Sequence, residues 1–463
     1  MSATTSTPAA LITARLDRLP ATRHIWVMVL LMALGGCFET YDIFFTAYVA
    51  PGLFKAGIFT PTTVSFFGLT GLASFIAALF LGLFIGTIAV SYIADRFGRR
   101  TIFVFALLWY CAATAILAFQ STAGALNFWR FIAGIGIGVE LVTIDAYLSE
   151  IVPKSIRGKA FAFQQGIGFA SVPIVAFLAW MLVPIAPLGF DGWRWVVLIG
   201  SAGAIVIWFL RLGLPESPRW LAQQGRLQDA ERVMAALEAK VQAEYGRPLP
   251  PIGAPEVEDP RPGRYREVFS PEYRGRTIML MVFNFAQTIG FYGFANWVPT
   301  LLIAKGIHVT QSLEYTFIIA LAYPAWPLIS MLFADKMERK WQVCAGALGI
   351  AVFGILFSTQ EAAAALIIIG LFQTASNTWL SFSFHNYQSE LYPTRVRARA
   401  VGFVYSWSRI SVVFTSYIIA FVLQNFGVTG VFTFIALAMG VVIVSIAAFG
   451  PKTNQLALEA ISR

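Results

Sequence analysis

Long apolar stretches, separated by short polar segments, run through nearly the whole chain. Each is about 20 residues long or longer, which lets a helix cross a hydrocarbon core of about 30 Å. Six of these stretches precede the polar segment 215–275 and six follow it. The pattern predicts an all-α membrane protein with twelve transmembrane helices. We place these helices at residues 24–50, 63–94, 101–121, 124–150, 158–186, 193–214, 276–304, 312–334, 341–359, 362–388, 398–424 and 427–449.

Two motifs recur at one constant spacing. Residues 147–163 (YLSEIVPKSIRGKAFAF) return as residues 387–403 (YQSELYPTRVRARAVGF), with seven of seventeen positions identical at an offset of 240. Residues 95–100 (DRFGRR) are echoed at the same offset by residues 335–340 (DKMERK). A shared offset indicates a duplicated architecture, because chance matches would not agree in their spacing. We therefore predict two pseudo-symmetric six-helix bundles and a linker with short helices between them, at residues 1–214, 276–463 and 215–275, respectively.

Basic residues gather on one side of the predicted topology. The chain is 58% hydrophobic and 12% charged, which is too apolar for a soluble protein, and its formal net charge is +9. With the N-terminus in the cytoplasm, Lys55, Arg194 and Lys305 fall in outer loops, and Arg130 and Arg409 fall within helices. Every other Lys and Arg lies on the cytoplasmic side, as the positive-inside rule requires. This pattern predicts cytoplasmic termini and argues against nucleic acid as a partner, because the charge follows topology.

The first predicted helix contains two acids. Glu39 and Asp42 are three residues apart and therefore lie close to one helical face. Asp42 lies ~12 Å below the outer surface, and a carboxylate at such a depth marks a functional site by default. Arg130 in the fourth helix lies at a similar depth, so the two can meet if these helices are neighbours. A purely structural acid, paired with a neighbouring helix, is the alternative for both Asp42 and Glu39.

Further polar residues fall within the predicted helices. Acids and cations inside a membrane usually face the protein interior or a cavity. Amides can bind a polar ligand or join two helices, and a histidine can titrate near neutrality or simply hydrogen-bond to its neighbours, which we favour here. The candidates for substrate binding are Gln164, Gln165, Glu140, Asp145, Gln287, Tyr292, Asn296, His385, Asn386 and Arg409.

No catalytic constellation is visible in the chain. The glycines at 134–138 follow no predicted strand, so they indicate a smooth groove for another helix and not a dinucleotide loop. Cys37, Cys111 and Cys344 are odd in number and lack ligand spacing, which is typical of packing residues. The linker offers an amphipathic helix around residues 225–241 but no Walker loop, paired His/Cys ligands or nucleophile motif. We expect no enzymatic activity, cofactor or metal.

These motifs resemble those of the major facilitator superfamily, and more closely its sugar-porter-like branches. The likeness is carried by residues 95–100, by Arg130 with the glycines after it, by Glu150 with Arg157, and by residues 215–221 (PESPRWL). It extends over nearly the whole chain through the copies in the second half. The resemblance implies two six-helix bundles that flank a midplane site and rock to expose it to either side.

Charged residues near the cytoplasmic helix ends form a predicted gate. An exposed ion pair contributes only about 0–1 kcal/mol. Several such bridges, within and between the halves, can hold one state and still be released by a ligand whose differential affinity is a few kcal/mol. The predicted gate residues are Asp95, Arg96, Arg99, Arg100, Glu150, Arg157, Asp335, Arg339, Lys340, Glu390 and Arg397.

The same resemblance implies a proton-coupling pair. In proton-coupled sugar porters an Asp that follows a Tyr in the first helix pairs with an Arg in the fourth, and Tyr41-Asp42 and Arg130 match those positions. Glu39 extends the motif to Phe-Glu-x-Tyr-Asp, which is similar to metabolite:proton symporters. We therefore assign proton coupling to Asp42, Glu39 and Arg130.

Departures from the sugar-porter pattern bear on the substrate. Gln165 and Gln287 match sugar-binding glutamines, but Tyr292 replaces a sugar-contacting Asn and His385 replaces a Trp that stacks on hexoses. Residues 291–299 (FYGFANWVP) are more similar to the branch related to nicotinate, aromatic-acid and organic-ion carriers. Buried arginines and many aromatic residues suit a small carboxylate.

We expect a monomeric secondary transporter of a bacterial inner membrane. By alternating access it would carry a small organic acid into the cell together with protons, so its partners are the substrate, protons and the lipid bilayer. One alternative is a sugar or polyol:proton symporter. An exporter is another, although residues 166–173 fit the Gly-Pro pattern of antiporters poorly. A transporter-like sensor is the third, and its usual sign, a long soluble signalling domain, is not visible.

Overall fold

The chain is almost entirely helical. The computed structural model describes residues 8–62, 67–253, 265–330, 337–392 and 394–452, and the β structure within them is one isolated bridge between Thr60 and Gly71. Nine helices in these residues are long and apolar enough to cross a membrane. The α-helices are α1 Pro8–Asp17, α2 Arg23–Lys55, α3 Leu72–Phe97, α4 Arg99–Leu117, α5 Ala123–Ile151, α6 Arg157–Leu182, α7 Gly192–Arg211, α8 Pro218–Gln223, α9 Leu227–Tyr245, α10 Arg274–Ala295, α11 Val298–Ala304, α12 Val309–Ala320, α13 Ala322–Ser330, α14 Arg339–Thr359, α15 Ala363–Glu390 and α16 Thr394–Phe449.

Helices lie on all twelve predicted stretches, with three differences in their continuity. The seventh stretch is divided into α10 and α11, because Pro299 lacks a backbone N–H and starts a new helix more readily than it continues one. The eighth is divided into α12 and α13 at Leu321. The last two stretches are joined in α16, whose path changes at Gly427 (φ 65°), a conformation that glycine adopts without steric cost.

Helices α2 to α7 form one bundle, in which small residues allow close approach. In this bundle α3 packs on α5, α2 on α6, and α7 on both α2 and α4. A Cβ atom added to Gly82 of α3 would lie 2.3 Å from the carbonyl oxygen of Phe131, and one added to Gly134 of α5 would lie 2.4 Å from that of Leu79. The predicted glycine groove is therefore confirmed, since no side chain fits between these two backbones.

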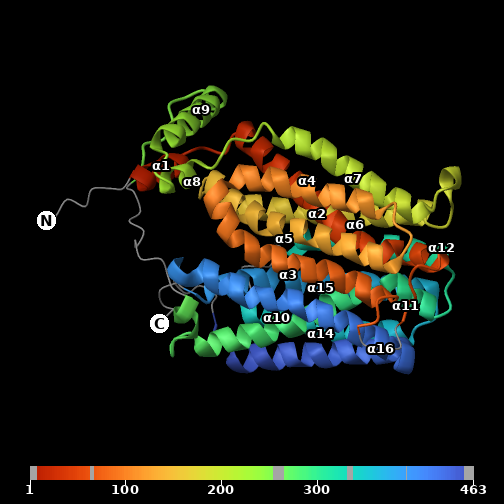
Figure 1. The fold of residues 1–463 in the computed structure, drawn as a ribbon. Helices are drawn as coiled ribbons and strands as arrows, with labels where there is room; N and C mark the ends of the chain where they lie inside the picture. Colours follow the sequence, from red (N-terminus) through yellow and green to blue (C-terminus); the bar gives the residue numbers. More distant parts are fainter. Residues whose placement is uncertain (1–7, 63–66, 254–264, 331–336, 393, 453–463) are drawn as a thin grey trace.

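Helices α10 to α16 form the second bundle, and the two bundles lie side by side (Figure 1). Within the second bundle α10 packs on α16, and α14 packs on α15 and α16. Between the bundles, α3 contacts α16, and α6 contacts α12 and α13. Two bundles of this kind confirm the predicted fold class, while the division at residues 214 and 276 stays a prediction.

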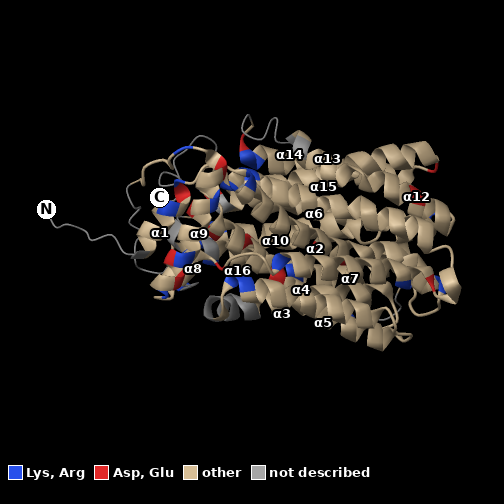
Figure 2. Ribbon diagram, turned by 90° about the horizontal axis from the view of Figure 1, so that it is seen from above, with Lys and Arg blue, Asp and Glu red and all other residues tan. Residues whose placement is uncertain are grey.

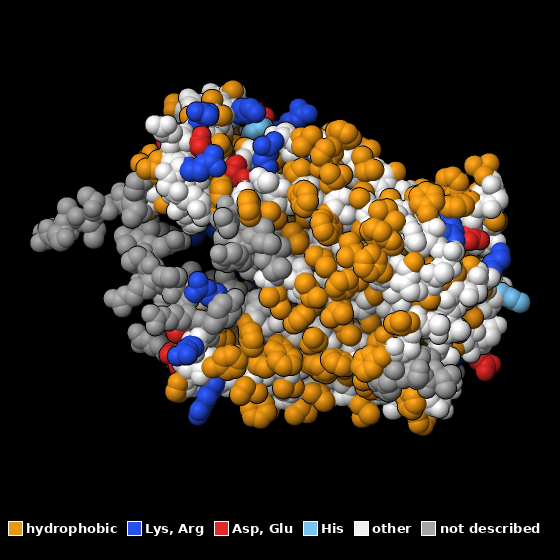
Figure 3. Space-filling view, in the orientation of Figure 1, with side chains coloured by type: hydrophobic (Ala, Val, Ile, Leu, Met, Phe, Trp, Pro, Cys, Tyr) orange, Lys and Arg blue, Asp and Glu red, His pale blue; other side chains and the backbone are white. Residues whose placement is uncertain are grey.

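Helix α1, the linker helices and the last described residues, at the end of α16, lie at one end of the molecule (Figure 1). We call the end that carries α1, α8 and α9 the terminal end, and the opposite end the distal end. Charged side chains are concentrated at the terminal end (Figure 2), and apolar side chains cover the middle of the face shown in Figure 3.

The linker helix α9 is fastened to the N-terminal helix α1. Arg15 forms ion pairs with Glu231 and Glu238, both at 2.6 Å, and Arg18 forms one with Glu238 at 2.6 Å. Beneath these pairs an apolar stripe of α9 that includes Met234 is buried. The predicted amphipathic helix of the linker is thus confirmed.

Candidate functional site

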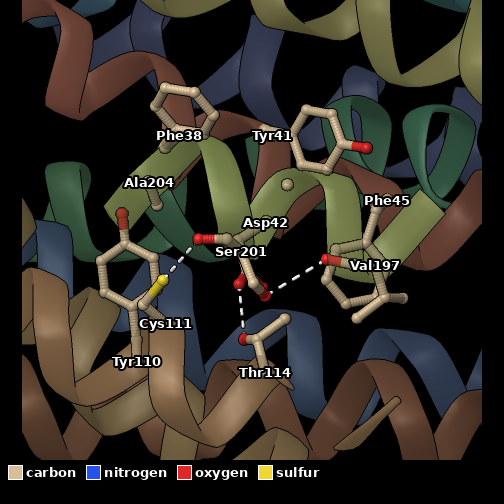
Figure 4. Close-up of a pocket in the computed structure, with 11 residues that line it drawn as sticks. Phe38, Tyr41, Asp42, Phe45, Tyr110, Cys111, Thr114, Val197, Ser201 and Ala204 are labelled. Atoms are coloured by element: carbon tan, nitrogen blue, oxygen red, sulfur yellow. Dashed lines mark hydrogen bonds between the residues drawn. The ribbon is translucent and has the colours of Figure 1, made fainter. Parts of the chain in front are cut away.

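A buried ion pair joins α2 to α5 in the distal part of the first bundle. The guanidinium of Arg130 donates to the Asp42 carboxylate, to the backbone carbonyl of Asp42 at 2.6 Å, and to the Thr46 hydroxyl. The Thr114 hydroxyl of α4 donates to the second carboxylate oxygen of Asp42 at 2.6 Å (Figure 4). Arg130 is fully buried. The predicted contact between Asp42 and Arg130 is therefore confirmed, and sequence reasoning missed both threonines.

Aromatic rings exclude solvent from this pair. The Arg130 guanidinium lies 4.2 Å from the ring centroid of Phe45 and 5.4 Å from that of Phe75. Beside Asp42 is a cavity of about 10 Å³, which is roughly the room that one water needs. Tyr41 borders this cavity and donates to the carbonyl of Val196 at 2.7 Å. The cavity is too small for an organic substrate and has room for about one water.

A second buried ion pair lies nearer the terminal end. Arg211 of α7 and Glu140 of α5 approach to 2.6 Å, and both side chains are fully buried. The Arg211 guanidinium lies 3.7 Å from the ring centroid of Phe103. A Cβ atom on Gly35 of α2 would lie 0.9 Å from an Arg211 nitrogen, so only glycine leaves room for this guanidinium.

This arrangement changes what the sequence indicated for both residues of the second pair. We counted Arg211 among the charges of the cytoplasmic loops, whereas in the structure it is the last residue of α7 and is buried against Glu140. Glu140 was a candidate for substrate contact, and in this conformation it faces Arg211 inside the first bundle. Its role toward substrate stays a prediction.

Three ionisable residues, two from the first bundle and one from the second, interact electrostatically but form no ion pair among the described residues. Glu39 of α2 interacts electrostatically with Asp145 of α5 and with Arg409 of α16. Arg409 is held by the hydroxyls of Tyr292 and Tyr405, to which it donates at 3.2 Å each. Asp145 is exposed and interacts electrostatically with Tyr405 of the other bundle. We call the group formed by Glu39, Asp145, Tyr292, Tyr405 and Arg409 the central site.

Other predicted substrate residues lie in or near the bundle interior. His385 contacts the ring of Phe384 at 4.1 Å between centroids and accepts from or donates to the Ser381 carbonyl at 2.7 Å. The Gln164 side chain points toward Gly36 of α2, whereas Gln165 is exposed. Gln287 is buried in α10, and Asn296 is buried at the end of that helix. The side chain of Asn386 lies outside the described part of the chain.

The distal end of the contact between the bundles is closed by aromatic rings. Phe44 of α2 meets Tyr323 of α13 at 5.2 Å and Phe291 of α10 at 6.4 Å between centroids. Trp180 of α6 stacks on Phe317 of α12 at 5.8 Å with an interplanar angle of 13°. These contacts join the two bundles away from the terminal end.

The predicted gate residues form ion pairs within bundles. Arg99 pairs with Glu150 at 3.2 Å, and Arg339 pairs with Glu390 at 2.6 Å. Between residues that the structure describes, no ion pair at the terminal end joins one bundle to the other.

The remaining gate residues have other partners or fall outside the description. Arg157 pairs with Asp17 of α1 at 3.3 Å. Lys340 donates to the carbonyl of Gly450 at 3.0 Å, and Arg100 donates to that of Leu212. Four predicted members have side chains, or whole residues, outside the described part of the chain: Asp95, Arg96, Asp335 and Arg397.

Two helical bundles that enclose buried charges and are closed at one end define a multi-pass membrane transporter. Comparison with known proteins agrees. The model of the family "Sugar (and other) transporter" matches residues 28–463. The chain belongs to this family, and it is a transporter and not an enzyme.

Named relatives show the range of the family. The inner membrane metabolite transport protein YdjE of Escherichia coli is 31% identical over 84% of this chain and 86% of its own length. The niacin transporter NiaP of Acinetobacter baylyi is 26% identical over 97% of this chain and 99% of its own length. The solved xylose transporter XylE of E. coli, a proton:xylose symporter, superposes with a TM-score of 0.74 at 20% identity over 94% of this chain and 99% of XylE.

Proposed function

We propose that this transporter carries a small organic acid across a bacterial inner membrane together with protons, by alternating access. The observation that carries the proposal is the buried pair of Asp42 and Arg130, held by Thr114 and Thr46. An ion pair in this position is costly to desolvate, and such groups in transporters mark ion and proton pathways. We further propose a monomer whose termini, and so the terminal end, lie in the cytoplasm.

Proton coupling follows from the dependence of this pair on helix packing. While Arg130 donates to Asp42, the ionised carboxylate has a counter-ion. A movement of α5 against α2 that withdraws Arg130 would leave a buried carboxylate unpaired, and binding a proton removes that cost. The proton would thus bind and leave as the bundles rock. Glu39 would contribute from the central site, since it contacts neither Asp42 nor Arg130.

Arg409 supports the choice of an organic acid. Its guanidinium is held by two phenol hydroxyls and has no carboxylate within 4.0 Å among the described residues. A guanidinium binds a carboxylate through two parallel hydrogen bonds, so a substrate carboxylate would complete its surroundings. Niacin, which names one relative, is an aromatic carboxylate of this kind.

The terminal-end charges would act as a gate. In this conformation Glu150 and Glu390 pair within their own bundles. Closing the terminal end would bring the two sets together and allow bridges between bundles, which a ligand of a few kcal/mol differential affinity could release.

Substitution of Asp42 tests the proposal. Asp42→Asn keeps the side-chain shape but cannot carry the negative charge, so we expect it to abolish substrate accumulation driven by a pH gradient in proteoliposomes. Exchange of internal for external substrate should partly survive, because it needs no net proton movement. The matched control is Asp191→Asn, which removes an exposed carboxylate from an ion pair at the distal end. Undiminished uphill uptake by Asp42→Asn would refute proton coupling through this residue.

Symport of a sugar or polyol is the second candidate. It is favoured by the family match and by the exposed amide of Gln165. The same proteoliposomes distinguish the two, since uptake of a neutral polyol and not of carboxylates would replace the first candidate.

A further inference from the structure

The central site contains acidic and basic side chains that have no ion-pair partner among the described residues. Glu39 and Arg409 are 6% and 4% exposed, yet neither lies within 4.0 Å of an oppositely charged group among the described residues. Arg211 is the other cation that interacts electrostatically with Glu39, and it already forms an ion pair with Glu140. Asp145 adds a second carboxylate that likewise has no ion pair within the described chain.

An unpaired charge inside a protein is costly, and this cost needs an explanation. A buried ionised group without a partner destabilises a protein by several kcal/mol unless something supplies the missing interaction. The Asp42 and Glu140 carboxylates each form an ion pair with an arginine of the first bundle. Buried acids whose role is structural can therefore find a partner within this bundle. Glu39 and Arg409 differ from these in that they come from different bundles and interact electrostatically without an ion pair between them.

The wall of the central site is aromatic. The Arg409 guanidinium lies 4.9 Å from the ring centroid of Tyr405, and the rings of Tyr405 and His385 are 5.4 Å apart. Tyr292 closes the distal side by contact with Phe80 of the first bundle, at 4.6 Å between centroids. Aromatic faces attract flat rings and cations, so they add to what the two acids offer.

We propose that the central site binds a zwitterion, a small aromatic or heteroaromatic molecule that carries both a carboxylate and a cationic nitrogen. Its carboxylate pairs with Arg409 and its cation lies between Glu39 and Asp145. This inference rests on the proposed uptake of an organic acid and narrows its substrate class. Such a ligand contacts both bundles at once, and in this way it favours their approach at the terminal end.

Three probes of nearly one shape test the charge requirement. They are 1-methylpyridinium-3-carboxylate (zwitterion), 3-methylbenzoate (anion) and 1-methylpyridinium-3-carboxamide (cation). Calorimetric titration of the purified full chain in lipid nanodiscs should show the zwitterion binding about tenfold more tightly than the anion, since one buried ion pair or cation–π contact contributes roughly 1–2 kcal/mol. The cation should bind more weakly than the zwitterion because it leaves Arg409 unpaired.

Charge-removing variants assign the contacts. Glu39→Gln and Asp145→Asn should each reduce the preference for the zwitterion over the anion several-fold while leaving anion binding unchanged or tighter. Arg409→Gln should weaken both carboxylate probes. The matched control, Glu361→Gln, removes an exposed acid just beyond α14 and should change nothing.

The possible failures separate the two proposals. If the wild-type chain binds the anion and the zwitterion equally, or if neither acid variant changes their ratio, the zwitterion inference is wrong and organic-acid transport stands. If neither carboxylate binds, both are wrong. The wild-type ratio alone decides the first point, so the test does not depend on how well any variant folds.

Discussion

Replacing Glu140 by Gln leaves the Arg211 guanidinium buried between α2, α5 and α7 without a counter-ion. Both side chains are fully buried and 2.6 Å apart, and the guanidinium packs directly against the backbone of Gly35. Removing one partner of such a pair costs roughly 3–5 kcal/mol. Arg211→Gln should cost about as much, since it leaves the Glu140 carboxylate unpaired and also ends a guanidinium–ring contact with Phe103, worth up to about 2 kcal/mol.

The double variant is the decisive measurement. Glu140→Met with Arg211→Leu removes both charges, so we expect its free energy of unfolding to return to within about 2 kcal/mol of wild type, because hydrophobic replacement of a whole buried pair is often neutral. Unfolding is followed by titrating dodecyl sulfate into mixed micelles, and the exposed-site variant Glu361→Gln should stay within about 0.5 kcal/mol. Single variants that cost under about 1 kcal/mol, or a double variant no better than the worse single, would refute this reasoning.

The same double variant also tests a predicted substrate contact. Glu140 was a candidate for substrate binding, whereas the structure gives it a partner inside one bundle. A stable double variant should therefore retain substrate binding. Loss of binding in a correctly folded double variant would show that Glu140 reaches the substrate in another conformation.

Two further predictions concern packing and pH. Gly82→Val places a branched side chain where even a Cβ atom alone would lie 2.3 Å from the Phe131 carbonyl oxygen. It should separate α3 from α5 and lower the apparent melting temperature by several degrees. An unchanged melting temperature would contradict the observed contact. Burial acts to raise the pKa of Glu238, but hydrogen bonds from Arg15 and Arg18 outweigh it, so its pKa is lowered from 4.5. A depressed acid stabilises the docked state above its unfolded pKa and loses that effect as pH falls through its folded pKa. A spin-label distance between α1 and α9 should therefore be short at pH 7 and lengthen as the pH falls well below 4.5, and it should lengthen at every pH in Glu238→Gln.

The sequence determined the features that depend on hydropathy and on repetition. Long, predominantly apolar stretches had to become helices, because a backbone in lipid must satisfy its own hydrogen bonds. The repeat at a fixed offset predicted two bundles, and the depth of Asp42 and Arg130 predicted that they could meet. Each of these follows from distance along the chain, which a sequence records directly.

Partner choice was decided by the tertiary structure. Arg211 ends an apolar stretch and looks like a topology charge, yet the rotation of α7 turns it toward Glu140. Glu39, only three residues from Asp42, was assigned with it to proton coupling, which stays a prediction; in the structure it interacts electrostatically with Asp145 and Arg409. Sequence records how deep a residue lies in a helix, but the direction in which its side chain points depends on the neighbours against which that helix packs. For this reason the buried charges could be foreseen, whereas the choice of which ones form ion pairs could not.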